Sequence, residues 1–191
     1  MSIKKPLIVN FLSGPGCLKS GIASGVFALL KLHYVDCELV TEFPKDLTWE
    51  ENWKLLGIQD AVFGEQNRRL ARIGDAVDVI VTDTTLLGSL IYRREALTAE
   101  FEAYVMSVYN SYNNLNITLT RNESASYEDF GRTQSLEDSI EVDDIVKLII
   151  EQHSIQCIKL DPGNETINKV TQIILDRFNL KMKYKVEETN G

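Results

Sequence analysis

The stretch "NFLSGPGCLKSGIAS" (residues 10–24) decides the fold, because it comes close to the phosphate-binding pattern G-x-x-x-x-G-K-[ST]. Lys19 and Ser20 fill the last two places of that pattern. Counting back from them, Leu18 stands at the second glycine and Ser13 at the first. A buried strand is expected before the stretch and a helix after it, which is the setting that the pattern requires. The sequence therefore predicts a phosphate-binding loop that is altered at two positions.

The backbone of this loop is the expected nucleotide contact. Consecutive N–H groups and the positive end of the following helix hold a phosphate chain. Lys19 would add a point charge beside the outer phosphates, and Ser20 a hydroxyl for Mg²⁺. A side chain at Leu18 crowds a place where glycine permits close approach, although the amides of the loop remain available. The predicted cofactor-binding residues are Gly14, Pro15, Gly16, Cys17, Leu18, Lys19, Ser20 and Gly21.

The bulk composition is that of one ordinary globular domain. At 191 residues the chain can bury a sizeable core, and its apolar runs are too short to span a bilayer. The net charge of -8 disfavours a large nucleic-acid-binding surface, although a small basic cleft stays open. Three scattered cysteines (Cys17, Cys37, Cys157) indicate neither a zinc site nor a disulfide framework. We expect a cytoplasmic, small-molecule enzyme with no membrane partner.

Apolar strands alternate with helix-like segments along the chain, which predicts an α/β fold with a parallel sheet covered on both faces. The expected strands span residues 6–13, 37–42, 77–83, 116–121 and 155–160. The expected helices span residues 20–31, 48–73, 97–109, 136–153 and 165–178. A single domain over residues 1–180 would carry a lid at about 122–135, where the sequence is polar and unusually long for a connection. Residues 181–191 are expected to form a C-terminal tail, of which the last stretch, "KVEETNG" (residues 185–191), is frayed.

Two carboxylates follow strands of the predicted sheet. Ligands of such sheets bind beyond the carboxyl ends of the strands, and both residues fall there. Asp83 ends the third strand and would help to hold Mg²⁺, which often needs only one carboxylate besides phosphate oxygens. Glu42 ends the second strand and could accept the proton of an attacking hydroxyl or hold a metal-bound water. A plain strand-end role remains an alternative for each, and Asp46 is a weaker candidate for the role of Glu42.

One face of the long helix combines polar and aromatic side chains at helical spacing. Amides and a ring on this face could read a base, so it is a predicted substrate-binding surface. A solvated face with Phe63 in the core explains the pattern equally well. Trp49 and Trp53 are expected to be core anchors. The residues of the face are Gln59, Phe63, Gln66 and Arg69.

Two arginines flank or lie on the predicted lid. Arg121 ends the fourth strand, and Arg132 lies within the polar segment. Arginines on a closing lid can offset the charge that spreads over a phosphoryl group during transfer. Arginines in a surface loop can equally be solvated. Their position at a strand end and on the lid favours catalytic roles for both.

With these pieces placed, the chain resembles the P-loop kinases with a NadR-like AAA domain, in particular the small phage-encoded members. The resemblance covers residues 7–160. It rests on "FLSGPGCLKS", "CELVTEFPKDLTWE", "QDAVFGEQNRR", "VDVIVTDTTLLGSLIY" and "ITLTR" with "YEDFGRTQ". It implies a three-layer P-loop NTPase fold with a five-stranded parallel sheet in the kinase-type order 2-3-1-4-5. ATP or GTP would bind with Mg²⁺.

The resemblance also assigns roles to residues. Lys19 and Ser20 would serve the phosphates and the metal, Asp83 the metal, and Glu42 the acceptor, with the lid arginines Arg121 and Arg132 beside them. It implies an ATP-dependent phosphotransferase acting on a nucleoside, a nucleotide or a related small acceptor. Two alternatives stay open: a nucleotide-binding protein with weak or no catalysis, because of the altered loop, and a kinase of hydroxymethylated bases in DNA. The acidic charge disfavours DNA as the acceptor, and a homodimer is left open. A phage-encoded member would act in the host cytoplasm.

Overall fold

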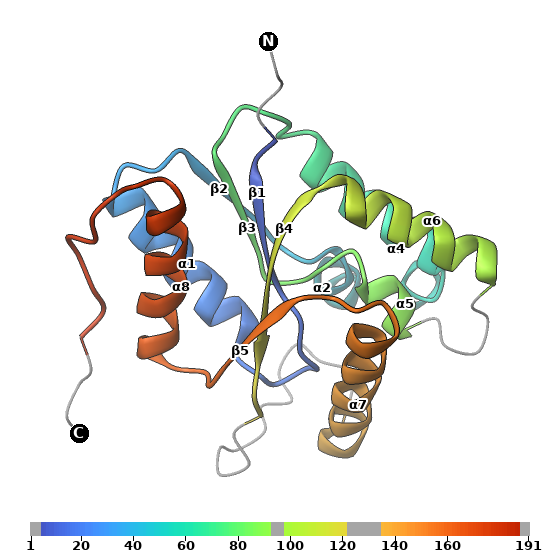
Figure 1. Ribbon diagram of the computed structural model, residues 1–191. Coiled ribbons are helices and arrows are strands. Elements are labelled where there is room, and N and C mark those ends of the chain that lie inside the picture. The colour runs from blue at the N-terminus through green and yellow to red at the C-terminus, as the bar shows by residue number, and fades with distance from the viewer. Residues whose placement is uncertain (1–4, 93–97, 122–134, 188–191) are drawn as a thin grey trace.

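The computed structural model describes residues 5–92, 98–121 and 135–187. Its centre is a five-stranded sheet in which every neighbouring pair of strands is parallel. From one edge to the other the strands are β2 (Cys37–Val40), β3 (Val79–Thr82), β1 (Leu7–Phe11), β4 (Asn113–Leu119) and β5 (Cys157–Leu160). The predicted order 2-3-1-4-5 is confirmed (Figure 1).

The first strand is the middle of the sheet and is buried on both faces. Every residue of β1 is buried, and Leu7 pairs with Val79 of β3 on one side and with Asn113 of β4 on the other. Val9 packs into one hydrophobic cluster and Ile8 into a second cluster on the opposite face. A strand in this position needs apolar side chains on both faces, which explains why its sequence shows no polar–apolar alternation.

Two layers of helices cover the sheet, as Figure 1 shows. One layer is α1 (Lys19–Leu32) with α8 (Asn164–Arg177), which contact each other. The other layer contains α4 (Gln59–Ala71), α5 (Gly88–Tyr92), α6 (Ala99–Ser111) and α7 (Leu136–Gln152). The three-layer α/β fold is therefore confirmed. No helix in the described ranges is both long and apolar enough to cross a membrane.

The single helix predicted for residues 48–73 is wrong. The chain forms α2 (Phe43–Trp49), α3 (Trp53–Leu56) and α4 instead. Glu51 adopts a left-handed backbone (φ 54°), and the side chain of Asn52 caps α3 by accepting from the backbone of Leu55. Thr48 does not begin a helix but lies in the last turn of α2, where its hydroxyl donates to the carbonyl of Pro44. These turns bend the segment around a cavity.

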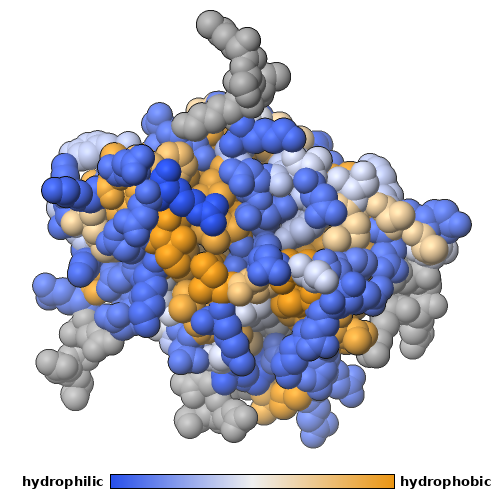
Figure 2. Space-filling model, viewed as in Figure 1, coloured by the Kyte–Doolittle hydropathy of each residue, from blue (hydrophilic) through white to orange (hydrophobic). Residues whose placement is uncertain are grey.

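The remaining boundaries refine the predicted ones. β2 and β3 stop short of the predicted strand ends, so Glu42 and Asp83 lie in the segments directly after them. The short helix α5 follows β3 and was not predicted. Trp49 and Trp53 are exposed at the surface, which contradicts the expected core positions. Hydrophilic side chains cover most of the face shown in Figure 2, with small hydrophobic areas between them.

The described part of the C-terminal tail is held against the domain. The backbone amides of Lys183 and Tyr184 donate to Nε2 of His33, at 2.8 and 3.2 Å. Asn168 of α8 exchanges two hydrogen bonds with the backbone of Val186, both 2.9 Å long. The prediction of a frayed end is therefore wrong for residues 185–187, because Asn168 of α8 binds the backbone of Val186.

Candidate functional site

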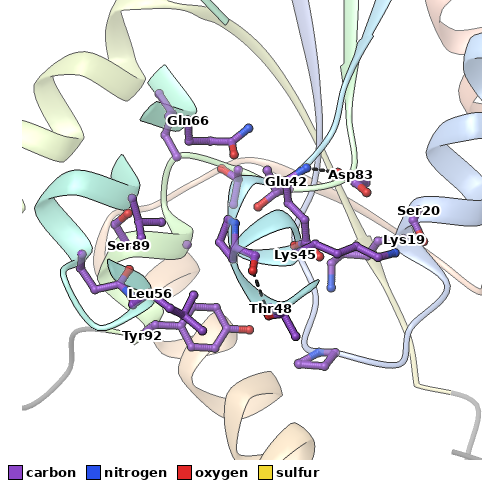
Figure 3. A pocket seen from close by; sticks show the side chains of 18 of the residues that line it. Lys19, Ser20, Glu42, Lys45, Thr48, Leu56, Gln66, Asp83, Ser89 and Tyr92 are labelled. Carbon is purple, nitrogen blue, oxygen red and sulfur yellow. Dashed lines mark hydrogen bonds between the residues drawn. The ribbon is translucent and has the colours of Figure 1, made fainter. Parts of the chain in front are cut away.

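A cavity of about 440 Å³ opens at the carboxyl edge of the sheet. The phosphate-binding loop and the start of α1 form one wall, and the segment from Glu42 through α4 forms another. The segment after β3, from Asp83 to Tyr92, closes the third side (Figure 3). The fold thus brings together, around one cavity, residues that are up to 77 positions apart in the chain, from Pro15 to Tyr92. This is the position at which open parallel sheets bind their ligands.

The loop has the geometry of an anion cradle despite its altered sequence. Gly16 (φ 86°) and Leu18 (φ 57°) both adopt left-handed backbone conformations, and α1 begins at Lys19. Such alternation of conformations makes successive amides converge on a concave surface. A left-handed leucine costs roughly 1–2 kcal/mol, which is why glycine is usual there. The side chain of Leu18 lies at the mouth of the cavity with 52% of its area exposed, so it does not fill the loop.

Ser13 has a structural role that accounts for its replacing the first glycine. Its hydroxyl accepts a hydrogen bond from the backbone N–H of Leu119 at 2.7 Å. The same hydroxyl lies within hydrogen-bond distance of the carbonyls of Leu12 (2.6 Å) and Leu119 (3.0 Å). The side chain therefore ties the beginning of the loop to the end of β4. No pattern in the sequence indicates this contact, because Leu119 is 106 residues away.

Lys19 is held inside the loop. Its Nζ donates to the carbonyl oxygens of Ser13 (2.7 Å) and Gly14 (2.8 Å). Burial lowers the pKa of this ammonium, and the carboxylates of Glu42 and Asp83 act in the opposite direction. The cation thus lies where phosphate oxygens resting on the loop amides would meet it.

Glu42 and Asp83 face the same cavity from neighbouring strands (Figure 3). Asp83 has 5% of its area exposed, and its Oδ1 accepts from the backbone N–H of Glu42 at 3.0 Å. Burial, with the negative charge of Glu42 as a smaller cause, raises the pKa of Asp83 to about 6, while Lys19 opposes this. The structure therefore brings the two predicted carboxylates together beside the predicted lysine.

These residues fit a magnesium ion bound together with a triphosphate. Ser20 and Asp83 both line the cavity, so a hydroxyl and a carboxylate are available to a metal. Within the described residues no group of three or more His, Cys, Asp or Glu side chains could hold a metal by itself. Mg²⁺ commonly uses one or two carboxylates, waters and substrate phosphates, which is the donor set present here.

The polar–aromatic face of α4 divides between the cavity and the core. Gln59 and Gln66 line the cavity. Phe63 is 2% exposed and packs edge-on against Phe101 and Tyr104, so it is a core residue and is not available to stack on a base. Part of the predicted substrate surface is thus wrong, and the competing interpretation of Phe63 is confirmed.

Gln66 and Arg69 also hold α4 to the segment after β2. Oε1 of Gln66 accepts from the backbone N–H of Phe43 at 2.8 Å. Arg69 bonds to Asp46 and Glu65 and lies over the ring of Phe43, outside the cavity lining. Asp46 is thereby committed to an ion pair. The hydrogen bond from Phe43 fixes the side chain of Gln66 where it lines the cavity.

The predicted lid arginines are only partly described. Arg121 does not line the cavity; its Nε pairs with Oδ2 of Asp143 at 2.7 Å, and its Nη2 donates to the carbonyl of Pro15 at 2.8 Å. Arg132 and residues 122–134 of the predicted lid lie outside the described residues. Asp143 was missed by the sequence analysis, because it is one of many acidic residues on α7.

Several further residues of the cavity were also missed. They come from "FPKDLT" after β2 and "DTTLLGSLIY" after β3, two stretches whose position beyond strand ends could have singled them out. The polar ones are Lys45, Thr48, Thr84, Thr85 and Ser89; Tyr92 adds apolar surface from the second stretch, and Leu56 adds it from α3.

Comparison with known proteins agrees with this architecture. The NadR protein, solved in complex with NR, superposes with a TM-score of 0.68 at 10% identity. The match covers 96% of this chain and 53% of NadR, so this chain spans about half the length of that protein. APS kinase CysC of Mycobacterium tuberculosis, solved with AMPPNP and APS, gives a TM-score of 0.46 at 16% identity, over 92% and 98% of the two chains.

Among curated proteins, no sequence matches this chain. At 10% identity the likeness to NadR shows the fold alone, which is the α/β P-loop kinase-like fold with sheet order 2-3-1-4-5. A family model described as AAA domain matches residues 9–166, which is most of the chain. The chain therefore belongs to this AAA domain family.

Proposed function

We propose that this protein is an ATP-dependent phosphotransferase acting on a nucleoside, a nucleotide or a related small acceptor. The observation that carries the proposal is the single cavity that continues from the phosphate loop to the polar and apolar wall of α2, α4 and α5. One end has amides, a lysine and a buried carboxylate. The other end has polar and apolar side chains that a second molecule could contact.

The nucleotide would bind at the loop end. Backbone N–H groups of the loop and the Lys19 ammonium would hold the triphosphate, and Ser20 with Asp83 would hold Mg²⁺. The bound metal would neutralise part of the charge on the phosphates. ATP and GTP are both accommodated by these contacts, since none of them involves a base.

The acceptor would bind between α4 and α5, with its hydroxyl toward the loop. An oxygen of that hydroxyl would attack the terminal phosphorus, the bond to the bridging oxygen would break, and ADP or GDP would leave. The proton of the hydroxyl would pass to the carboxylate of Glu42, which lines the cavity beside Asp83. Lys19 would offset negative charge on the transferred group.

Transfer of labelled phosphate tests the proposal directly. The purified chain would be incubated with Mg²⁺ and ATP or GTP, together with a panel of nucleosides, nucleotides and an oligonucleotide containing hydroxymethylated bases. Lys19→Met should abolish transfer, whereas Lys31→Met, at the exposed far end of the same helix, should leave it unchanged. No product with any acceptor would refute the proposal.

A nucleotide-binding protein with little catalysis is the second candidate. Leu18 favours it, because its side chain stands at the cavity where a glycine would permit closer approach of the transferred phosphate. Heat stabilisation by MgATP without product formation, across the whole panel, would select this candidate over the first.

A further inference from the structure

Asp143 of α7 binds the phosphate loop and the end of β4 at the same time. Its Oδ1 accepts from the backbone N–H of Gly14 at 2.8 Å, and its Oδ2 accepts from Nε of Arg121 at 2.7 Å. The guanidinium of Arg121 also donates to the carbonyls of Pro15 (2.8 Å) and Ser139 (3.1 Å). One carboxylate and one guanidinium thus join three segments that are far apart in the chain.

The approach of α7 to the loop is close enough to require glycine at residue 14. A Cβ atom on Gly14 would lie 2.5 Å from Oδ1 of Asp143 and 2.7 Å from the backbone oxygen of Ser139. Backbone oxygens cannot yield as the tip of a long side chain can. The glycine is therefore needed for contact with α7, and the first turns of this helix rest directly on the loop.

The ion pair makes this contact compatible with an anionic ligand. An unpaired carboxylate beside a phosphate site would repel the phosphates. The side chains of Arg121 and Asp143 are 13% and 20% exposed, so their charges are largely removed from water and offset one another. Asp143 can then hold the Gly14 amide without adding a net negative charge at the loop.

We propose that Asp143 is a positioning residue for nucleotide binding. By fixing Gly14, with Arg121 as its counter-ion, it keeps the phosphate loop in the shape in which the amides after Gly14 are presented to the cavity. This inference rests on the proposed function, because it concerns how the same site holds its nucleotide. Arg121 then has a role in supporting the loop, in addition to the catalytic role that the sequence predicts for it.

Two substitutions at this position separate positioning from charge. Asp143→Asn and Asp143→Ala remove the same negative charge and the same ion pair, so any electrostatic gain in phosphate affinity is common to both. Only asparagine keeps an oxygen that can accept from Gly14, and its NH2 group then faces Arg121 where the second carboxylate oxygen accepted before. Asp144→Ala is the matched control, because Asp144 is the next residue of α7, is 70% exposed and pairs with Lys147 on the helix surface.

Titration calorimetry with MgATP gives the decisive comparison. We expect Asp143→Ala to bind about fivefold more weakly than Asp143→Asn, since a hydrogen bond to a neutral acceptor contributes about 1 kcal/mol. Asp144→Ala should bind as the unaltered chain does. Equal affinities of the alanine and asparagine variants would overturn the inference and leave the proposed function intact.

Hydrogen exchange at the Gly14 amide provides a measurement that needs no nucleotide. In the unliganded chain this amide should be protected, and Asp143→Ala should speed its exchange about tenfold while Asp143→Asn changes it less. If the unaltered chain bound no nucleotide, the proposed function would fail, and this exchange would still test the holding contact. Exchange that is equally fast in the unaltered chain and the alanine variant would overturn the inference.

Discussion

Asp83→Asn should stabilise the unliganded protein and abolish phosphate transfer. Asp83 is buried beside Glu42, and its pKa is raised from an ordinary 3.8 to about 6. The folded chain therefore disfavours the charged carboxylate, and the unfolded chain does not. Asparagine has nearly the same shape, carries no charge, and its oxygen can still accept from the backbone of Glu42.

The size of the effect follows from the two pKa values. At pH 8 the side chain is ionised in both states, and a difference of about two pKa units corresponds to about 3 kcal/mol of lost stability. The penalty decreases as the pH falls through 6, because the folded state then takes up its proton before the unfolded state does. It is roughly 0.6 kcal/mol at pH 4, near the ordinary pKa.

Thermal unfolding at several pH values measures this difference. For a chain of this length, about 3 kcal/mol corresponds to an increase of about 9 °C in Tm for Asp83→Asn at pH 8, shrinking toward pH 4. MgATP should reverse the order, since only the carboxylate is suited to Mg²⁺ and only the unaltered chain should then transfer phosphate. Glu38→Gln, an exposed carboxylate on β2, is the control. A variant that melts no higher at pH 8 than the unaltered chain would refute the reasoning.

Three further substitutions test the loop and its surroundings. Leu18→Gly should raise Tm by about 2 °C, because relief of left-handed strain exceeds the added freedom of the unfolded chain, and should tighten MgATP binding, because glycine permits a phosphate to approach the loop more closely; calorimetry showing unchanged or weaker binding would contradict this. Gly14→Ala should cost about 2–3 kcal/mol in denaturant unfolding, because its Cβ meets α7, whereas Gly21→Ala, whose Cβ would meet no atom of another segment within 4 Å, should cost nothing; equal effects would argue against the α7 contact. Phe63→Leu should lower Tm by a few degrees while leaving the acceptor KM unchanged, since this ring lies in the core; a raised KM at normal stability would restore the base-reading role.

Much of the fold was predictable from local patterns. The loop at residues 13–20 fixes a strand before it and a helix after it, and the apolar run of β1 indicates a strand with both faces covered. Glu42 and Asp83 could be placed at one edge because parallel strands end on the same side of a sheet. The helix predicted over residues 48–73 was wrong, since the left-handed turn at Glu51 has no glycine to announce it.

Contacts between distant segments could not be predicted in the same way. Ser13 bonds to Leu119, and Gly14 to Asp143, across more than a hundred residues. Phe63 shares a helical face with residues that reach the cavity, and only the packing of α6 shows that its ring is covered. Arg121 is a strand-end arginine in the sequence, and its partner on α7 is known only from the fold.

By itself, the sequence determined the fold class of this protein. The spacing of residues in the phosphate loop and the period of apolar residues are local patterns of a few residues, and together they indicate a phosphate loop in a chain of alternating strands and helices. The tertiary structure alone decided which side chains face the cavity and which support it. Burial, pairing and close approach depend on the positions of atoms from several segments at once. The pKa of Asp83 and the need for glycine at residue 14 both arise in this way, from neighbours that the folded chain brings into contact.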